Sequence, residues 1–231
     1  LKAGVMDPNE EARVLELCRE RLGPDFGLRI DPNGVWSVPT AVRIGKRLEP
    51  LNIEYFEDPS WGLNGNAAVR EQINIPIATN MYPAKFDDLA PAIKLGSVDI
   101  VLTDIHYWEG PRGVKDLAAI CRTFNLGVSM HSGAEFGIEL AAMLHTASTI
   151  PEMSFAGDAH YHYLTDDIIQ GGLMQYEDGC LKVPTGPGLG VALDEEKMKI
   201  YERYYEKMGD YYARFHQDPK RPDWYPIVGG Q

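Results

Sequence analysis

The sequence predicts a barrel of alternating β-strands and α-helices. Three observations lead to this prediction: short apolar runs recur along the chain, each run ends in a polar residue, and a helix-like stretch follows each run. The polar residues that end the runs lie 23 to 29 residues apart, at Lys2, Asp31, Glu57, Asn80, Asp104, His131 and Asp158. One strand, one helix and two short loops need about this length of chain, so each interval holds one parallel βαβ step.

The predicted elements alternate without a long interruption. We expect a strand that ends at Lys2, followed by strands over 27–30, 53–56, 75–79, 100–103, 127–130 and 154–156. We expect the intervening helices over 10–22, 38–48, 67–72, 85–95, 113–124 and 138–148. Seven consecutive units favour a TIM-type (β/α) barrel over an open sheet, and the sequence has no GxGxxG segment after a first strand, which a dinucleotide-binding sheet would carry. Because such a barrel has eight strands, one is unaccounted for, and we expect it on the N-terminal side.

The pattern changes after residue 165. Residues 166–231 contain glycine-rich turns, a polar helix from about 194 to 216, and a proline-rich tail. We therefore divide the chain into barrel units over 1–165, corresponding to strands 2 to 8, and a C-terminal segment over 166–231. The first residue is Leu1 instead of an initiator Met, so we expect the chain to start inside a longer protein.

Composition excludes several classes of protein. The chain has 34 acidic and 22 basic residues and a formal charge of −12, which argues against a nucleic-acid binder. No apolar run is long enough to cross a membrane, and no signal peptide is recognisable. The three cysteines form no CxxC pair, so a reducing, cytoplasmic compartment is the simpler interpretation.

Asp31, Glu57 and Asn80 follow three successive strands and offer only oxygen atoms. The active site of a (β/α) barrel lies at the carboxyl ends of its strands, where these residues are expected. Oxygen ligands suit Mg²⁺, whereas zinc prefers histidine or cysteine. Each residue taken singly also fits a helix cap or a turn, but three in matching positions favour a magnesium site.

Lys2, Asp104 and His131 follow other strands of the same barrel. A lysine near a cation has its pKa lowered and can act as a base. A histidine held by an aspartate on the neighbouring strand can act as an acid or a base, so we expect Asp104 to orient His131. Taken alone, such a lysine is more often a surface charge, and such a histidine is more often structural.

Several of these segments resemble the glucarate dehydratases of the enolase superfamily. The resemblance is carried by residues 28–33, 57–59, 78–81, 104–108, 121–124, 130–132 and 158–160, and it covers the chain from Lys2 to about His160. It implies Mg²⁺ as cofactor, Asn80 as the ligand typical of this subgroup, and Lys2 as the second lysine of a Lys-x-Lys motif. It also implies a homo-oligomer and a separate, mostly N-terminal α+β domain that caps the barrel.

The resemblance weakens directly after His131, where the family has His-Ser-Asn-x-His. This chain has Gly133 and Glu135 in place of the amide and the second imidazole. The substrate pocket therefore differs, and an aldarate or an aldonate other than glucarate is as well supported. The residues expected to contact the substrate are Asn33, His106, Ser132, Glu135 and His160.

The resemblance implies an acid-sugar dehydratase. Mg²⁺ would bind the carboxylate of a small acid sugar and acidify the adjacent C–H, Lys2 or His131 would remove the proton, and loss of the β-hydroxyl would give a 2-keto-3-deoxy acid. The same residues would also serve a racemase or epimerase, or remain in a non-catalytic barrel relative. A zinc hydrolase is disfavoured because the first strand lacks His-x-His.

Overall fold

The computed structural model describes residues 1–151 and 153–208. These residues form two compact units. Unit 1 contains residues 1–103 and 117–129, and unit 2 contains residues 104–116 together with the described residues from 130 onward. The proline-rich tail and the end of the predicted C-terminal helix lie outside the described residues.

A parallel sheet forms the centre of unit 1. Its strands are β1 (Arg29–Ile30), β2 (Tyr55–Glu57), β3 (Ile77–Thr79), β4 (Ile100–Thr103) and β5 (Gly127–Met130), the last of which ends in unit 2. They are ordered β1-β2-β3-β4-β5, and the pairs from β1 to β4 are parallel. A doubly wound sheet would reverse its strand order, so this sequential order confirms the predicted barrel-type arrangement.

The segment around Lys2 pairs with the free edge of β1 in the same direction. Lys2 forms a parallel bridge with Asp31. Ala3 N donates to Asp31 O at 2.8 Å, and Asp31 N donates to Leu1 O at 3.0 Å. Lys2 thus lies where a preceding strand was predicted.

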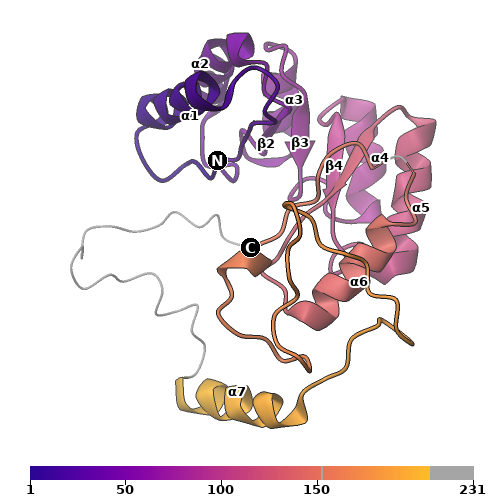
Figure 1. The fold of residues 1–231 in the computed structure, drawn as a ribbon. Coiled ribbons are helices and arrows are strands. Elements are labelled where there is room, and N and C mark those ends of the chain that lie inside the picture. The colour runs from indigo at the N-terminus through magenta and orange to yellow at the C-terminus, as the bar shows by residue number, and fades with distance from the viewer. Residues whose placement is uncertain (152, 209–231) are drawn as a thin grey trace. The chain divides into compact units, whose positions relative to one another are not determined.

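Helices connect the strands of unit 1. They are α1 (Pro8–Leu22), α2 (Val38–Leu48), α3 (Gly62–Arg70), α4 (Phe86–Leu95) and α5 (Gly110–Thr123), the last of which begins in unit 2. The 3₁₀ turn η1 (Glu49–Leu51) follows α2. Contacts join α1 to α2, α2 to α3, and α3 to α4, as Figure 1 shows for the indigo and violet helices. Helices that are consecutive in sequence are therefore neighbours in space, as in a (β/α) barrel.

Caps and apolar spacing explain why α1 and α2 begin where they do. Asp7 accepts a hydrogen bond from Asn9 N at 2.8 Å, and Pro8 occupies the first turn of α1. Ser37 caps α2 in the same way. The buried positions of α2 have the spacing of one helical face, and Gly45 lets Ile73 pack closely, since a Cβ there would lie 2.9 Å from Ile73 Cδ1.

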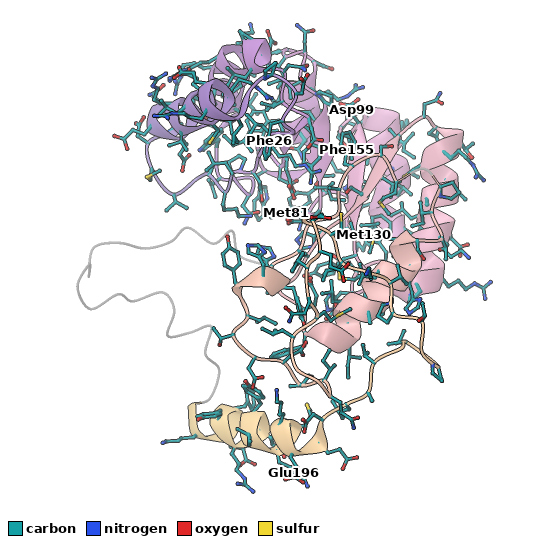
Figure 2. All side chains as sticks on the ribbon, in the orientation of Figure 1. Phe26, Met81, Asp99, Met130, Phe155 and Glu196 are labelled. Atoms are coloured by element: carbon teal, nitrogen blue, oxygen red, sulfur yellow. The ribbon has the colours of Figure 1, made fainter. Side chains whose placement is uncertain are left out.

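The two ends of the sheet carry different kinds of residue. Asp99, just before β4, accepts from Arg70 at 2.6 Å and from Ile77 N at 2.9 Å, which joins the amino ends of the strands. Met81 follows the carboxyl end of β3. Figure 2 labels both residues and shows them at opposite ends of the strands. The predicted site residues Asp31, Glu57 and Asn80 belong to the carboxyl end.

Unit 2 contains α6 (Gly137–Ala147), the 3₁₀ turn η2 (Tyr161–Tyr163) and α7 (Glu195–Met208), which is yellow in Figure 1. Asp167 is buried at its centre and accepts from Gly137 N at 3.1 Å and from the Tyr161 hydroxyl. An antiparallel bridge between Ile169 and Leu193 leads the chain into α7. No helix within the described ranges is long and apolar enough to span a membrane.

Two sequence predictions of secondary structure are wrong. Residues 154–156 form no strand; Ser154 and Ala156 are exposed, so this run buries little surface, and Asp158 N instead donates to Met130 O at 2.8 Å. Helix α3 begins at Gly62 and not near residue 67. Two glycines disfavour helix in its first turn, but the buried side chain of Asn66 joins Ser60 N to Asp58 and holds that turn in place.

Candidate active site

Strand register places Asp31 and Glu57 side by side. Ile30 pairs with Phe56, so the next residues, Asp31 and Glu57, occupy equivalent positions on β1 and β2. Glu57 pairs with Ala78, and Asn80 lies two residues further along the same strand direction. Because side chains alternate along a strand, these positions share one face of the sheet. The three predicted ligands are therefore grouped at the carboxyl ends of adjacent strands in unit 1.

Lys2 and Asn33 join this group. Lys2 Nζ donates to Asp31 Oδ2 and, at 2.9 Å, to Asn33 Oδ1. The second oxygen of Asp31 accepts from Asn33 N at 2.7 Å. Asn33 has a φ of 53°, in the left-handed region that asparagine tolerates better than most residues. The lysine side chain is 58% exposed, so it is accessible to a ligand above the sheet.

Asp58 is a structural residue of the site that sequence reasoning treats only as part of a turn. It is fully buried and accepts hydrogen bonds from Asn66 Nδ2 at 3.3 Å, from Asn80 N at 3.1 Å and from the Thr79 hydroxyl. Burial, and then the negative charge of Asp31, raise the pKa of Asp58 to about 7 against these hydrogen bonds. By holding Thr79 and Asn80, Asp58 fixes the end of β3. The sequence signal is its place in Glu57-Asp58-Pro59, directly after a predicted ligand.

Asp104 and His131 form a hydrogen-bonded pair in unit 2. Asp104 Oδ2 lies 3.0 Å from His131 Nδ1, and Asp104 Oδ1 accepts from the backbone N–H groups of His106 at 2.9 Å and Tyr107 at 2.8 Å. Burial acts to raise the pKa of Asp104, but these hydrogen bonds outweigh it, so the pKa lies below its ordinary value. The ionised carboxylate holds the ring of His131 through its Nδ1.

His106 is paired with Glu139, a residue that sequence reasoning missed. His106 Nε2 lies 2.6 Å from Glu139 Oε1, and its Nδ1 lies 4.0 Å from Asp104 Oδ1. Burial raises the pKa of Glu139; the charge of His106 opposes this, while the charges of Glu135 and Asp104 add to it. Glu139 lies in the first turn of α6, where acidic residues are common, so its sequence position alone gave no signal of this contact.

Ser132, Glu135 and His160 form a third group, also in unit 2. Ser132 Oγ donates to the carboxylate of Glu135, at 2.7 Å from Oε2 and 3.0 Å from Oε1. His160 places both its backbone N and its Nδ1 at 2.9 Å from the same hydroxyl. Glu135 is only 3% exposed. Three of the residues predicted to contact the substrate are thus connected through one serine.

The predicted residues therefore fall into two sets. The set in unit 1 comprises Lys2, Asp31, Asn33, Glu57 and Asn80, and the set in unit 2 comprises Asp104, His106, His131, Ser132, Glu135 and His160. The donor atoms of Asp31, Glu57 and Asn80 are all oxygens, which fits Mg²⁺. In the part of the chain that the structure describes, no three histidine, cysteine, aspartate or glutamate side chains form a group that would suit zinc.

Comparisons with known proteins agree with this architecture. A family model described as "Enolase C-terminal domain-like" matches residues 1–197. A probable glucarate dehydratase of Streptomyces coelicolor is 42% identical over 88% of this chain and 46% of its own length. An arabinonate dehydratase of Saccharolobus solfataricus is 27% identical over 88% of this chain and 54% of its own length. A chloromuconate cycloisomerase of Cupriavidus pinatubonensis is 26% identical over 88% of this chain and 55% of its own length.

Solved structures extend the comparison. An isomerase from Streptomyces coelicolor A3(2) superposes with a TM-score of 0.84 at 45% identity, covering 88% of this chain and 54% of the other. An enolase from Pseudomonas fluorescens Pf0-1 with bound magnesium, potassium and tartrate superposes with a TM-score of 0.88 at 37% identity, covering 96% and 53%. The chain spans about half the length of the relatives that it matches. The family match and the 42% identity show that this chain belongs to the enolase superfamily and carries its C-terminal barrel domain.

Proposed function

We propose that the chain carries the catalytic groups of a Mg²⁺-dependent acid-sugar dehydratase. The observation that carries this proposal is the register that groups Lys2, Asp31, Glu57 and Asn80 at the carboxyl ends of adjacent strands. The probable glucarate dehydratase and the arabinonate dehydratase among its relatives support dehydration. The tartrate and magnesium bound to a similar structure support a hydroxy acid as ligand and Mg²⁺ as cofactor.

Asp31, Glu57 and Asn80 are the proposed ligands of Mg²⁺. Their two carboxylates and one amide oxygen are the kind of donor that Mg²⁺ prefers, and they would hold the ion together with water and the substrate. When bound, the ion would supply positive charge to the carboxylate of the substrate and so make the adjacent C–H more acidic. Asp58 would support these ligands indirectly, since it holds the backbone of Asn80.

Lys2 is the proposed base on one side of the substrate. Its ammonium group is held between Asp31 and Asn33, which fixes the nitrogen at the end of the sheet next to the ligands. It takes the proton from the α-carbon in its uncharged form.

His131 is the proposed acid. Its Nδ1 is engaged with Asp104, so Nε2 is the nitrogen that can hand a proton to the departing β-hydroxyl. Loss of that hydroxyl as water leaves an enol, which becomes a 2-keto-3-deoxy acid.

The experiment is a screen of acid sugars with Mg²⁺ in the full-length protein that carries this chain, with the 2-keto-3-deoxy product detected as its semicarbazone. We expect turnover of at least one sugar and its loss with EDTA. We expect Lys2→Met and His131→Asn each to lower kcat by about 10²-fold or more. The exposed Lys94→Met, on α4, is a matched control for the lysine variant. Failure of the metal-loaded protein to release product from any sugar would contradict the proposal.

An isomerase is the second candidate, because the isomerase and cycloisomerase among the similar proteins use the same fold. A racemase or epimerase would return the proton from the opposite side without loss of water. Incorporation of solvent deuterium at the α-carbon of recovered substrate, with no keto acid formed, would identify this activity.

A further inference from the structure

The hydroxyl of Ser132 has a defined direction of hydrogen bonding. It carries one proton, and the ionised carboxylate of Glu135, whose oxygens lie 2.7 and 3.0 Å away, can only accept. The serine proton therefore goes to Glu135. The same oxygen accepts from His160, whose backbone N and Nδ1 each lie at 2.9 Å, and more weakly from Ala134 N at 3.4 Å.

This direction fixes the tautomer of His160. Since the serine oxygen has no second proton to donate, Nδ1 of His160 must carry the hydrogen that joins the two residues. In the neutral ring, Nε2 then has a free lone pair and accepts a hydrogen bond. His160 is exposed, so this acceptor is available to a ligand. A hydroxyl group can donate to it, whereas a carboxylate has no proton to give.

The negative charge around Ser132, Glu135 and His160 also favours a neutral hydroxyl over a carboxylate as the ligand. Glu135 is buried, and within the described residues no lysine or arginine forms an ion pair with it. Its carboxylate acts on Glu139, as that of Asp104 does, and these charges favour the protonated form of Glu139. A second carboxylate on the substrate would add a further negative charge beside Glu135, which like charges disfavour.

We propose that Glu135, Ser132 and His160 form a subsite that accepts a hydrogen bond from a substrate hydroxyl and so selects aldonates, which end in a neutral hydroxymethyl group, over aldarates, which end in a second carboxylate. This inference rests on the proposed dehydratase function. Ser132 directly follows the proposed acid His131 in the sequence. Glu135 stands at the position where the family motif has its second histidine.

The first test compares acid sugars in matched pairs. Gluconate and glucarate, or galactonate and galactarate, share the configuration of their reacting carbons and differ only at the far end. With the full-length protein and Mg²⁺, we expect kcat/KM for the aldonate of the accepted pair to exceed that for the aldarate by about tenfold or more. Equal turnover, or a preference for the aldarate, would overturn the inference.

Variants then separate the hydrogen-bond chain from the overall charge. Glu135→Gln and Ser132→Ala each break the chain, and we expect each to narrow the aldonate-to-aldarate ratio by about fivefold or more. Asp116→Asn removes one exposed negative charge of unit 2 without contacting Ser132, so it should narrow the ratio less. An equal effect of Asp116→Asn and Glu135→Gln would rule out a role for the chain. Ser132→Ala keeps the test decisive if the glutamine variant fails to fold.

A third measurement does not depend on activity. Nitrogen-15 NMR of the histidine rings distinguishes a protonated Nδ1 from a protonated Nε2, and His160→Gln assigns the signal. We expect the Nδ1–H form in the wild type and its loss in Ser132→Ala. The Nε2–H form in the wild type would overturn the inference even if dehydration were demonstrated. Absence of turnover with the Nδ1–H form present would instead count against the proposed function.

Discussion

Glu11 is a buried carboxylate in the first turn of α1, and it holds the segment that follows Lys2. Its oxygens accept from three consecutive backbone N–H groups, those of Gly4 and Val5 at 2.9 Å and that of Met6 at 2.8 Å. By its place in the sequence Glu11 is an ordinary acidic residue of a first helical turn, which it shares with Glu10. Its burial to 1% exposure shows that it serves the loop instead of the helix dipole.

Replacing Glu11 by alanine should lower the free energy of unfolding by about 2 kcal/mol, because three donors in a partly buried loop lose their acceptor. Urea denaturation followed by circular dichroism measures this change. Glu10→Ala, in the same turn but exposed, is the matched control and should change stability by less than about 0.5 kcal/mol. Equal effects of the two variants would show that the loop does not depend on Glu11.

Asp104 gives a prediction on pH. Its pKa is below the ordinary 3.8, since the hydrogen bonds from His131 and the backbone outweigh its burial. A lowered pKa means that the ionised form stabilises the folded state; this contribution is complete above the unfolded pKa and is lost as the pH falls through the folded one. The free energy of unfolding should therefore be higher for the wild type than for Asp104→Asn at pH 6. The difference in this free energy should shrink towards pH 3.

Urea titrations at several pH values measure that difference. Asp116→Asn, an exposed aspartate on α5, is the control for the loss of one carboxylate. If the difference in the free energy of unfolding between wild type and Asp104→Asn stays constant from pH 6 to pH 3, ionised Asp104 does not stabilise the folded state.

The sequence predicted those residues of the candidate site that directly follow a strand. The hydrogen bond between Asp104 and His131 was expected from the sequence and is present, while the catalytic roles remain predictions. The contacts of Glu139 with His106, and of Asp58 with Asn80, were not predictable. They join residues from different elements, and each glutamate or aspartate has an ordinary local explanation as a helix-start or turn residue.

At the scale of elements, the helices with clear caps were predicted to within a few residues. Asp7 and Pro8 mark the start of α1, and Ser37 marks that of α2. The predicted start of α3 was wrong because the actual start depends on a tertiary contact. The buried side chain of Asn66 holds the first turn in place despite its glycines. Local sequence signals thus predicted the order and number of the βα units better than the first and last residues of each helix.

Helix α7 is tied to unit 2 through Asp166. This aspartate accepts from Lys197 and, at 2.9 Å, from the Tyr201 hydroxyl. The hydrogen bond from Lys197, with help from the Asp167 backbone and Tyr201, lowers the pKa of Asp166 to about 2. The carboxylate therefore stays ionised, and this attachment of α7 is lost only as the pH falls to about 2.

Replacing Asp166 by asparagine should weaken the attachment of α7 at neutral pH. Hydrogen exchange measured by mass spectrometry should become faster in peptides from α7 and remain unchanged in those from α1. Glu196→Gln, which changes the charge of α7 at a residue paired with Lys199 on the same helix, is the control. Equal exchange in α7 for wild type and Asp166→Asn would show that other contacts hold the helix.

At the scale of the whole molecule, the net charge of −12 affects every measurement of metal binding. Any cation screens repulsion among the acidic residues, so a rise in Tm with MgCl2 does not by itself demonstrate a site. A specific site differs in two ways: it responds to Mg²⁺ beyond the response to NaCl at equal ionic strength, and it depends on particular carboxylates. Asp31 and Asp99 allow this distinction, since Asp31 follows the carboxyl end of β1 whereas Asp99 precedes the amino end of β4.

Asp31→Asn and Asp99→Asn each raise the net charge by one, so they alter the general screening effect equally. At a Mg²⁺ concentration about 100 times its dissociation constant, a specific site stabilises the folded state by about 2.7 kcal/mol, which raises Tm by a few degrees. We expect this rise in the wild type and in Asp99→Asn, whose starting Tm will be lower because Arg70 loses its partner. We expect it to vanish in Asp31→Asn, and NaCl at matched ionic strength should produce only a small, equal shift in all three proteins. A Mg²⁺ response that survives in Asp31→Asn would place the cation elsewhere and would remove the metal from the proposed mechanism.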